Sequence, residues 1–265
     1  MTTDNFIEPY NPKPVKLDHI SHSQLDLWQG CPKQWEYIYV YNMQRGSSAA
    51  LILGDCYHGT LEQNFKAKLT LGHDLDLDIL LDYFSTRWNK AVFGAWDLDF
   101  GKSTRGEQKD LGIALVTKYM EEVAPSIIPA QVELTLNSVV NGVNFTLRCD
   151  LITDNNIVID HKTSAKHYTQ GQVDADSQAS ATAFALRRPI VFQNHVAVKT
   201  KTPDIQIVRT YRTSADINWW YRKASAIVAH MQSGYAPPNE DYMYCSPRNC
   251  KFYDICKKDL ARSII

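Results

Sequence analysis

Residues 143–164 read VNFTLRCDLITDNNIVIDHKTS. Apolar and polar residues alternate over the first part of this stretch, a period of two that is typical of a strand with one buried face. The dipeptide Asn155-Asn156 is a turn signal, and it precedes a second apolar run that ends in polar residues. We therefore predict two antiparallel strands, Val143–Ile152 and Ile157–Lys162, joined by a tight hairpin.

Acidic residues fall on both predicted strands. Asp150 lies on the polar face of the first, and Asp160 follows the apolar run of the second. Because side chains alternate along a strand, Asp160 and Lys162 should share a face while His161 points the other way. Neighbouring strands lie about 4.8 Å apart, so both carboxylates could reach one cation of magnesium size.

The flanking sequence predicts a helical half followed by the rest of a sheet. Another strand, Gln131–Val139, precedes the hairpin and joins it through Asn141-Gly142. Further elements are expected as helices near Leu25–Ile38 (capped by Ser21 or Ser23), Ala49–Lys68, Leu75–Trp88, Glu107–Val123, Ser177–Leu186 and Ala215–Met231, and as strands Pro189–Val198 and Ile205–Tyr211.

This order predicts one α/β domain spanning residues 1–265, with a small mixed sheet and a long N-terminal helical insertion. Its expected parts are an extended arm over 1–18, a mainly helical region over 20–125, a sheet core over 131–212, and a C-terminal helix with a cysteine-rich segment over 215–262.

The composition fits a folded protein whose net charge creates no strong electrostatic field. Hydrophobic residues make up 44% of the 265 residues, and the formal net charge is −1, so any contact with nucleic acid must come from local basic patches. Neither a secretory leader nor an apolar run of about 20 residues is visible, so we expect an intracellular, cytoplasmic protein that does not enter membranes. In that setting its cysteines are expected to be thiols or metal ligands.

The acidic pair is suited to hydrolysis of a phosphodiester. A divalent cation held by Asp150 and Asp160 could activate a water, and Lys162 could orient or deprotonate that water or neutralise phosphate charge. The alternative is an ordinary charged strand edge. Charges that follow a buried apolar run are costly to bury, however, unless they are paired or have a functional role. His58 could be an ordinary helix residue, with Glu62 on the same face one turn later, and Glu133 could face solvent.

Cysteines gather near the C-terminus at Cys245, Cys250 and Cys256. Thiolates this close together usually bind a metal, and Cys31 is the best candidate for a fourth ligand. Zinc and an iron–sulfur cluster both accept four thiolates. Unrelated buried thiols are the alternative.

These motifs together resemble a PD-(D/E)XK nuclease of the RecB-like type, similar to small CRISPR-associated and phage-encoded exonucleases that carry a 4Fe–4S cluster. The resemblance runs from about Ile20 to Lys258. It is carried by Gly54-x-x-x-His58, Asp150-Leu-Ile, Ile159-Asp-His-Lys-Thr163 and the four cysteines.

The resemblance implies a restriction-endonuclease-like core and a role for each motif. His58, Asp150 and Asp160 would bind Mg²⁺ or Mn²⁺, Lys162 would assist the attacking water, and Glu133 would be an auxiliary acid. Gln178 matches the first position of a Gln-x-x-x-Tyr motif. The cluster ligands would be Cys31, Cys245, Cys250 and Cys256, joining the N- and C-terminal regions.

Two positions depart from the family pattern. Arg148 stands where glycine is usual, and Thr182 replaces the tyrosine of the Gln-x-x-x-Tyr motif. The expected activity is a metal-dependent DNA exonuclease acting on single-stranded or end-containing DNA in recombination, repair or phage DNA processing, alone, as a homo-oligomer or within a larger complex. The alternatives are a catalytically inactive DNA-binding module and a zinc-containing structural subunit.

Overall fold

The computed structural model describes residues 12–44, 47–95, 98 and 100–262. Their contacts divide the chain into two compact units. The central unit contains residues 47–136 and 148–218, and the terminal unit contains the described parts of residues 1–46, 137–147 and 219–265. Most of the predicted extended arm lies outside the described residues.

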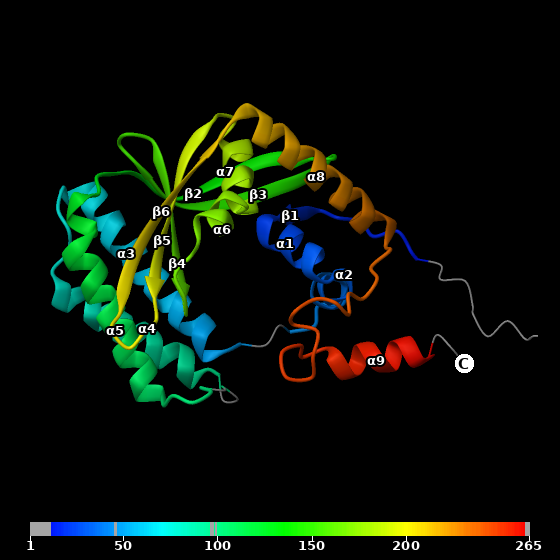
Figure 1. Ribbon diagram of the computed structural model, residues 1–265, viewed down its shortest axis with the longest axis horizontal. Helices are drawn as coiled ribbons and strands as arrows, with labels where there is room; N and C mark the ends of the chain where they lie inside the picture. The colour runs from blue at the N-terminus through cyan, green and yellow to red at the C-terminus, as the bar shows by residue number, and fades with distance from the viewer. Residues whose placement is uncertain (1–11, 45–46, 96–97, 99, 263–265) are drawn as a thin grey trace, which may run out of the picture. The chain divides into compact units, whose positions relative to one another are not determined.

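Figure 1 labels the helices and strands along the chain. Short helical segments are Glu36–Val40, which is π-helical, and Ala124–Ser126, which is 3₁₀. The other elements are β1 (His19–Ser21), α1 (His22–Gly30), α2 (Pro32–Trp35), α3 (Ala49–Leu71), α4 (Leu77–Phe93), α5 (Arg105–Glu122), β2 (Pro129–Val140), β3 (Val143–Thr153), β4 (Ile157–Ser164), α6 (Gln170–Asp174), α7 (Ser177–Leu186), β5 (Ile190–Val198), β6 (Asp204–Arg212), α8 (Ser214–Ser233) and α9 (Tyr253–Arg262).

The strands form a mixed six-stranded sheet in the order β1-β3-β4-β5-β6, with β2 also paired to β3. β3 and β4 are antiparallel, as the hairpin predicted, while β4 and β5 are parallel and β5 and β6 antiparallel. Two hairpin turns contain residues with a positive φ. They are Asn141 and Gly142 (48° and 78°) and Asn156 (65°). Asparagine and glycine tolerate this conformation. Both predicted turn signals are confirmed.

Helices cover both faces of β4–β6 in the central unit. On one face, Tyr119 of α5 hydrogen-bonds to His161 of β4 and His195 of β5. On the other, Gln178 of α7 hydrogen-bonds to Asp160 of β4. The alternation of side chains along β4 therefore sends consecutive residues to different helical layers, as predicted for Asp160 and His161.

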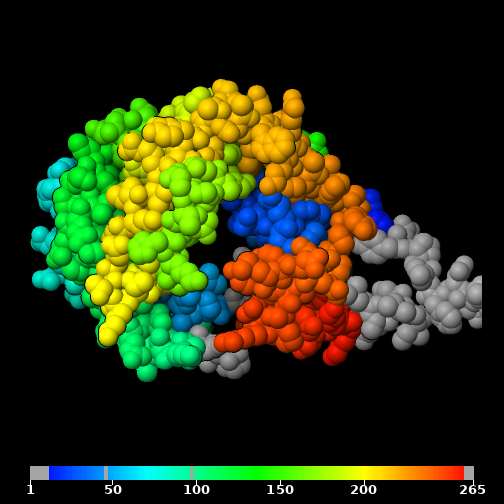
Figure 2. All heavy atoms as spheres, in the orientation of Figure 1, coloured from blue at the N-terminus to red at the C-terminus, as the bar shows by residue number. Residues whose placement is uncertain are grey.

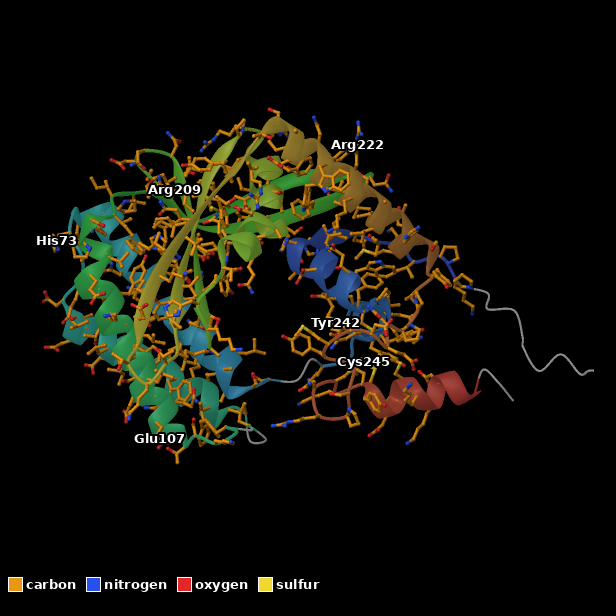
Figure 3. All side chains as sticks on the ribbon, viewed as in Figure 1. His73, Glu107, Arg209, Arg222, Tyr242 and Cys245 are labelled. Carbon is orange, nitrogen blue, oxygen red and sulfur yellow. The ribbon has the colours of Figure 1, made fainter. Side chains whose placement is uncertain are left out.

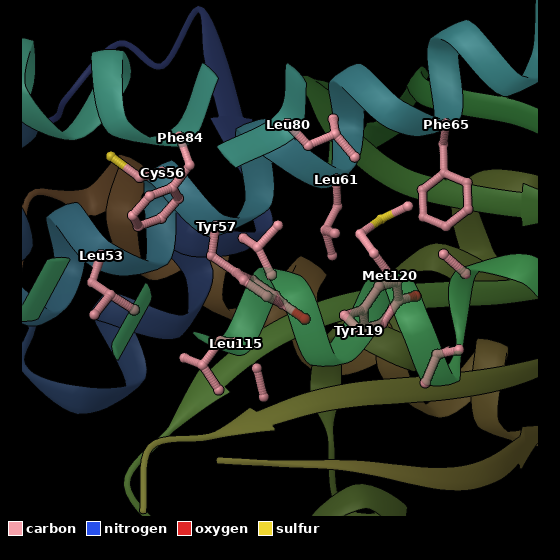
Figure 4. Close-up of a cluster of buried hydrophobic side chains, with 14 of the residues drawn as sticks. Leu53, Cys56, Tyr57, Leu61, Phe65, Leu80, Phe84, Leu115, Tyr119 and Met120 are labelled. Carbon is pink, nitrogen blue, oxygen red and sulfur yellow. The ribbon is translucent and has the colours of Figure 1, made fainter. Parts of the chain in front are cut away.

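The core of the central unit lies between the sheet and the layer of α3, α4 and α5 (Figure 4). Tyr57, Leu61 and Phe65 recur along α3 at helical spacing and are almost completely buried. Ser48 caps the start of α3 by accepting a hydrogen bond from Leu51 N–H, and Gly72 ends the helix with a φ of 81°. This helix carries His58, which contacts Asp150 of β3.

The terminal unit joins the two ends of the chain. β1 pairs in parallel with the beginning of β3, and Trp220 of α8 packs its ring against Phe145, with ring centroids 5.3 Å apart. Asn239 donates a hydrogen bond to Gly30 O (2.9 Å), and Tyr37 donates one to Asp259 (2.7 Å). In Figure 2 the segment before α9 lies against α1, in agreement with the first of these bonds.

Most predicted elements are present with small shifts at their ends. α7 has the predicted bounds, and Ser21 rather than Ser23 caps α1. β1, α6 and α9 were not predicted, because each is short or lacks a strong apolar period. Among the helices that the structure describes, none combines the length and apolar character needed to cross a lipid bilayer.

Candidate metal and catalytic site

The candidate site lies where β3 and β4 separate. Their pairing joins Leu151 to Ile159 and Ile152 to Val158, and Asp150 and Asp160 are the next residues along the two strands. Beyond that point the Asp150 carboxylate, instead of a backbone carbonyl of β3, accepts a hydrogen bond from β4. Its Oδ2 accepts a hydrogen bond from the backbone N–H of His161 at 2.9 Å.

His58 reaches this point from α3. Gly54 lies one turn earlier, where α3 approaches β4 so closely that a Cβ would stand 3.2 Å from Thr163 Oγ1. His58 Nε2 lies 3.1 Å from Asp150 Oδ2 and 3.2 Å from Glu133 Oε1. One imidazole therefore contacts two carboxylates from two different strands.

Glu133 is held by an unusual backbone. It has a φ of 54° within β2, a left-handed conformation that is costly for a glutamate and often occurs at functional sites. The guanidinium of Arg148 lies beside it, with Nε 2.6 Å from Oε2. Arg148, which stands where glycine was expected, thus forms an ion pair with Glu133, the predicted auxiliary acid.

Asp160 makes a second cluster with Lys162 and Gln178. Lys162 Nζ lies 2.8 Å from Asp160 Oδ2 and donates a hydrogen bond to Gln178 Oε1 at 2.8 Å. Gln178 in turn donates to Asp160 Oδ1 at 2.5 Å. The three predicted residues are therefore brought together by β4 and α7.

Burial and neighbouring charges give Asp150 and Asp160 very different pKa values. Burial acts to raise the pKa of Asp150, but the hydrogen bond and charge of His58 outweigh it and lower that pKa to about 2. Burial raises the pKa of Asp160 to about 7, because the charge of Lys162 offsets it only in part and Asp150 adds repulsion. Two adjacent carboxylates with such different pKa values mark a candidate functional site.

The pKa values of His58 and Lys162 also depart from their ordinary values. Burial acts to lower the pKa of His58, but Asp150 and Glu133 reverse this effect and raise it. Likewise, burial of Lys162 is outweighed by Asp160, so its pKa is raised and the amine is a cation at neutral pH. This favours charge neutralisation or orientation of water by Lys162 over proton abstraction.

Two overlapping groups of side chains are close enough to hold one cation, and they share His58. In each group the ligand atoms lie within 4.8 Å of one another: His58 with Asp150 and His161, and His58 with Glu62 and Glu133. Asp160 belongs to neither of these groups among the described residues. Asp150 and Glu133 therefore fall in separate groups that share His58, and Asp160 lies beside Lys162.

The donors suit a hard divalent cation. Glu133 Oε2 and Asp160 Oδ2 are buried, and each lies beside a cationic nitrogen, Arg148 Nε at 2.6 Å and Lys162 Nζ at 2.8 Å. Carboxylate oxygens with an imidazole are ligands that Mg²⁺ and Mn²⁺ accept. The residues present therefore fit such an ion.

Sequence reasoning missed part of this cluster. Glu62 was noted only as a neighbour of His58 on the helix face, and His161 only as pointing away from Asp160. Thr182, at the position of the missing tyrosine, is buried and donates its hydroxyl hydrogen to Gln178 O at 2.8 Å. It therefore continues the helix and does not supply a polar group to the site.

The four cysteines line one cavity in the terminal unit. Cys31 lies between α1 and α2, Cys256 lies on α9, and Cys245 and Cys250 lie on the segment before it; Figure 3 labels Cys245. Burial raises the pKa of Cys250 and Cys256, and the charge of Cys31 raises both further. No three of these sulfurs lie within 4.8 Å of one another among the described residues.

Residues 19–257 match the PD-(D/E)XK nuclease superfamily, and the chain belongs to that superfamily. Membership implies a metal-dependent nuclease, and the mixed sheet flanked by helices is consistent with a restriction-endonuclease-like core. Comparison with curated proteins gave no match.

A solved structure of similar fold supports this architecture. The chain is similar to the crystal structure of a "Putative exonuclease" from Eubacterium rectale, with a TM-score of 0.59 and 12% identity over 91% of this chain and 88% of that one. It also matches the crystal structure of SSO0001 at a TM-score of 0.43 and 14% identity, over 92% of this chain and 88% of that one. At these identities the first likeness concerns the fold alone.

Proposed function

We propose that the protein is a Mg²⁺- or Mn²⁺-dependent deoxyribonuclease, acting as an exonuclease on single-stranded or end-containing DNA. The observation that carries this proposal is the convergence of His58 Nε2 on Asp150 and Glu133 at 3.1 and 3.2 Å, beside the Asp160–Lys162–Gln178 cluster. The name of the Eubacterium rectale protein adds support for exonucleolytic attack.

The residues would divide the work between them. His58, Asp150 and Asp160 would hold the cation, with Glu133, whose Oε1 lies 3.2 Å from His58 Nε2, as an auxiliary acid. When bound, the cation would activate a water and offset charge on the phosphate. Lys162 would carry its proton throughout and donate hydrogen bonds to the water or to a phosphate oxygen, and Gln178 would keep the amine in place.

An end-labelled digestion series tests the activity. We expect Mg²⁺ or Mn²⁺ to support stepwise shortening of single-stranded or end-containing DNA, and EDTA to stop it. Asp160→Ala should lose cleavage and retain DNA binding, while Asp82→Ala, an exposed aspartate of α4, should behave as the wild type. Intact DNA with wild-type protein and both metals would refute the nuclease.

An inactive DNA-binding subunit is favoured by one observation, the ion pair between Arg148 and Glu133, which places a guanidinium beside a proposed ligand. The same digestion series separates this function from the nuclease, because a subunit of that kind would bind DNA in the wild type and show no cleavage for Asp160→Ala to remove.

We also propose that the cysteine cavity holds a 4Fe–4S cluster. Four thiols from the N- and C-terminal segments line this one cavity, and four thiolates are the ligand set that both a 4Fe–4S cluster and a zinc ion accept. Contacts such as Tyr37 with Asp259 already join the N- and C-terminal segments here, and the cluster would add a covalent link.

Metal analysis of protein prepared without oxygen tests this proposal. We expect a brown protein with about four irons per chain that loses iron and colour in Cys256→Ser. Cys149→Ser, a change of a buried cysteine on β3 in the central unit, is the matched control and should keep both. A colourless protein with one zinc per chain would refute the cluster.

A further inference from the structure

A line of polar side chains, exposed at one end, crosses the central unit and ends at the candidate metal site. Its members come from β6, β5, α5, β4 and β3 in turn. They are Arg209, Gln193, His195, Tyr119, His161 and Asp150.

The sheet register builds most of this line. Gln193 lies directly opposite Arg209 across β5 and β6, and His195 lies opposite His161 across β4 and β5. Tyr119 comes from α5 and bridges the two histidines, with its hydroxyl 2.8 Å from His195 Nδ1 and 2.9 Å from His161 Nε2. All members but Arg209 and Asp150 are at least nine-tenths buried, and the hydrogen bonds of the line join them to one another.

The exposed end, Arg209 on β6 (labelled in Figure 3), fixes the direction of the first bond. A guanidinium can only donate hydrogen bonds, so the Gln193 atom beside it must be the amide oxygen. In that orientation the oxygen lies 3.1 Å from Arg209 Nε and 2.8 Å from Nη2, and the amide nitrogen donates to His195 Nε2 at 3.0 Å. His195 Nε2 is therefore an acceptor.

The donor and acceptor of each following hydrogen bond are then fixed by the bond before it. A neutral imidazole carries one N–H, so His195 must carry it on Nδ1 and donate to the oxygen of Tyr119. The Tyr119 hydroxyl has one hydrogen, which it donates to His161 Nε2. His161 is left with its own hydrogen on Nδ1. Burial lowers the pKa of His195 to about 3, which agrees with a neutral ring at the start of this sequence of bonds.

His161 thus directs two N–H groups at one carboxylate oxygen. Its backbone N–H donates to Asp150 Oδ2 at 2.9 Å, and its Nδ1 lies 3.7 Å from the same oxygen, within reach of electrostatic attraction though too far for a hydrogen bond. A reversed line would instead aim the lone pair of Nδ1 at this site, where His161 could be a ligand together with His58.

We propose that this relay, which starts at Arg209, keeps His161 as the Nδ1–H tautomer and makes it a positioning residue for Asp150, not a metal ligand. The inference rests on the proposed function only in taking Asp150 as a ligand. Outer residues of this kind change metal affinity by about 10- to 100-fold when they are removed.

Nitrogen-15 NMR of the histidine rings in the full-length protein tests the direction. We expect His161 and His195 to show a protonated Nδ1 and an unprotonated Nε2. Gln193→Glu should reverse the relay, because a carboxylate beside Arg209 can only accept from His195 Nε2–H, and His161 should then become the Nε2–H tautomer. The control Gln63→Glu, at an exposed position of α3, should leave both rings unchanged.

A double variant tests whether the signal passes through Tyr119. In a Tyr119→Phe background, Gln193→Glu should no longer change His161. Wild-type His161 with its hydrogen on Nε2, or a His161 tautomer that does not respond to Gln193→Glu, would overturn the relay. A Mn²⁺ titration separates the two claims: absence of Mn²⁺ binding with His161 as Nδ1–H overturns the metal site alone, whereas Mn²⁺ binding with His161 as Nε2–H overturns the relay alone.

Discussion

Replacing Asp160 by asparagine should stabilise the metal-free protein at alkaline pH while abolishing cleavage. Asp160 is 3% exposed, and its carboxyl has a pKa of about 7, raised from 3.8 by burial and by the charge of Asp150. A group whose pKa is higher in the folded state binds its proton more tightly there, so folding loses stability as pH rises from 3.8 to about 7. Asparagine has nearly the same shape and never ionises.

The size of the effect follows from the two pKa values. Between the unfolded and folded pKa, each pH unit costs the wild type about 1.4 kcal/mol relative to Asp160→Asn. Integrated from pH 5 to pH 8, the difference between the variants should change by about 2.5 kcal/mol in favour of asparagine. Any fixed cost of placing an amide beside Lys162 cancels from this change, because it is the same at each pH.

Urea unfolding in EDTA at several pH values measures the difference. Asp82→Asn, a change at an exposed position of α4, is the matched control and should track the wild type throughout. A difference between Asp160→Asn and wild type that stays constant from pH 5 to pH 8 would refute the reasoning, since the buried carboxyl would then have an ordinary pKa in the fold.

Other perturbations test neighbouring parts of the molecule. Mg²⁺ at 100 times its dissociation constant should stabilise the wild type by about 2.7 kcal/mol and Asp160→Asn by much less, as a shift in thermal midpoint will show. Arg148→Ala should tighten Mn²⁺ binding about two- to fivefold by calorimetry, because it removes a largely exposed cation paired with Glu133 and such pairs are worth up to about 1 kcal/mol; weaker binding would contradict this. Gly112→Ala should lower the free energy of unfolding by about 1–3 kcal/mol, since its Cβ would stand 2.1 Å from Cζ of the buried Phe84, and an unchanged urea midpoint would mean that the helix interface is looser than described.

The local sequence was sufficient for the hairpin and for most of the secondary structure. The alternation along β3 and the Asn141-Gly142 turn act over a few residues, and both have the predicted form. The same locality explains why Asp160 and Lys162 were predicted to share a face and do so. Short elements such as β1 and α6 were not predicted from the sequence, because they depend on partners distant in the chain.

Of the candidate site, the sequence determined which residue types were available and in what order, because motif spacing and strand period are local properties. Only the tertiary structure decided what each residue contacts. The left-handed backbone of Glu133, its pairing with Arg148 and the line from Arg209 through Tyr119 to His161 all depend on contacts between elements far apart in sequence. Burial within that packing sets the charge states of Asp160 and His161, since desolvation is the largest contribution to both pKa shifts and no window of neighbouring residues specifies it.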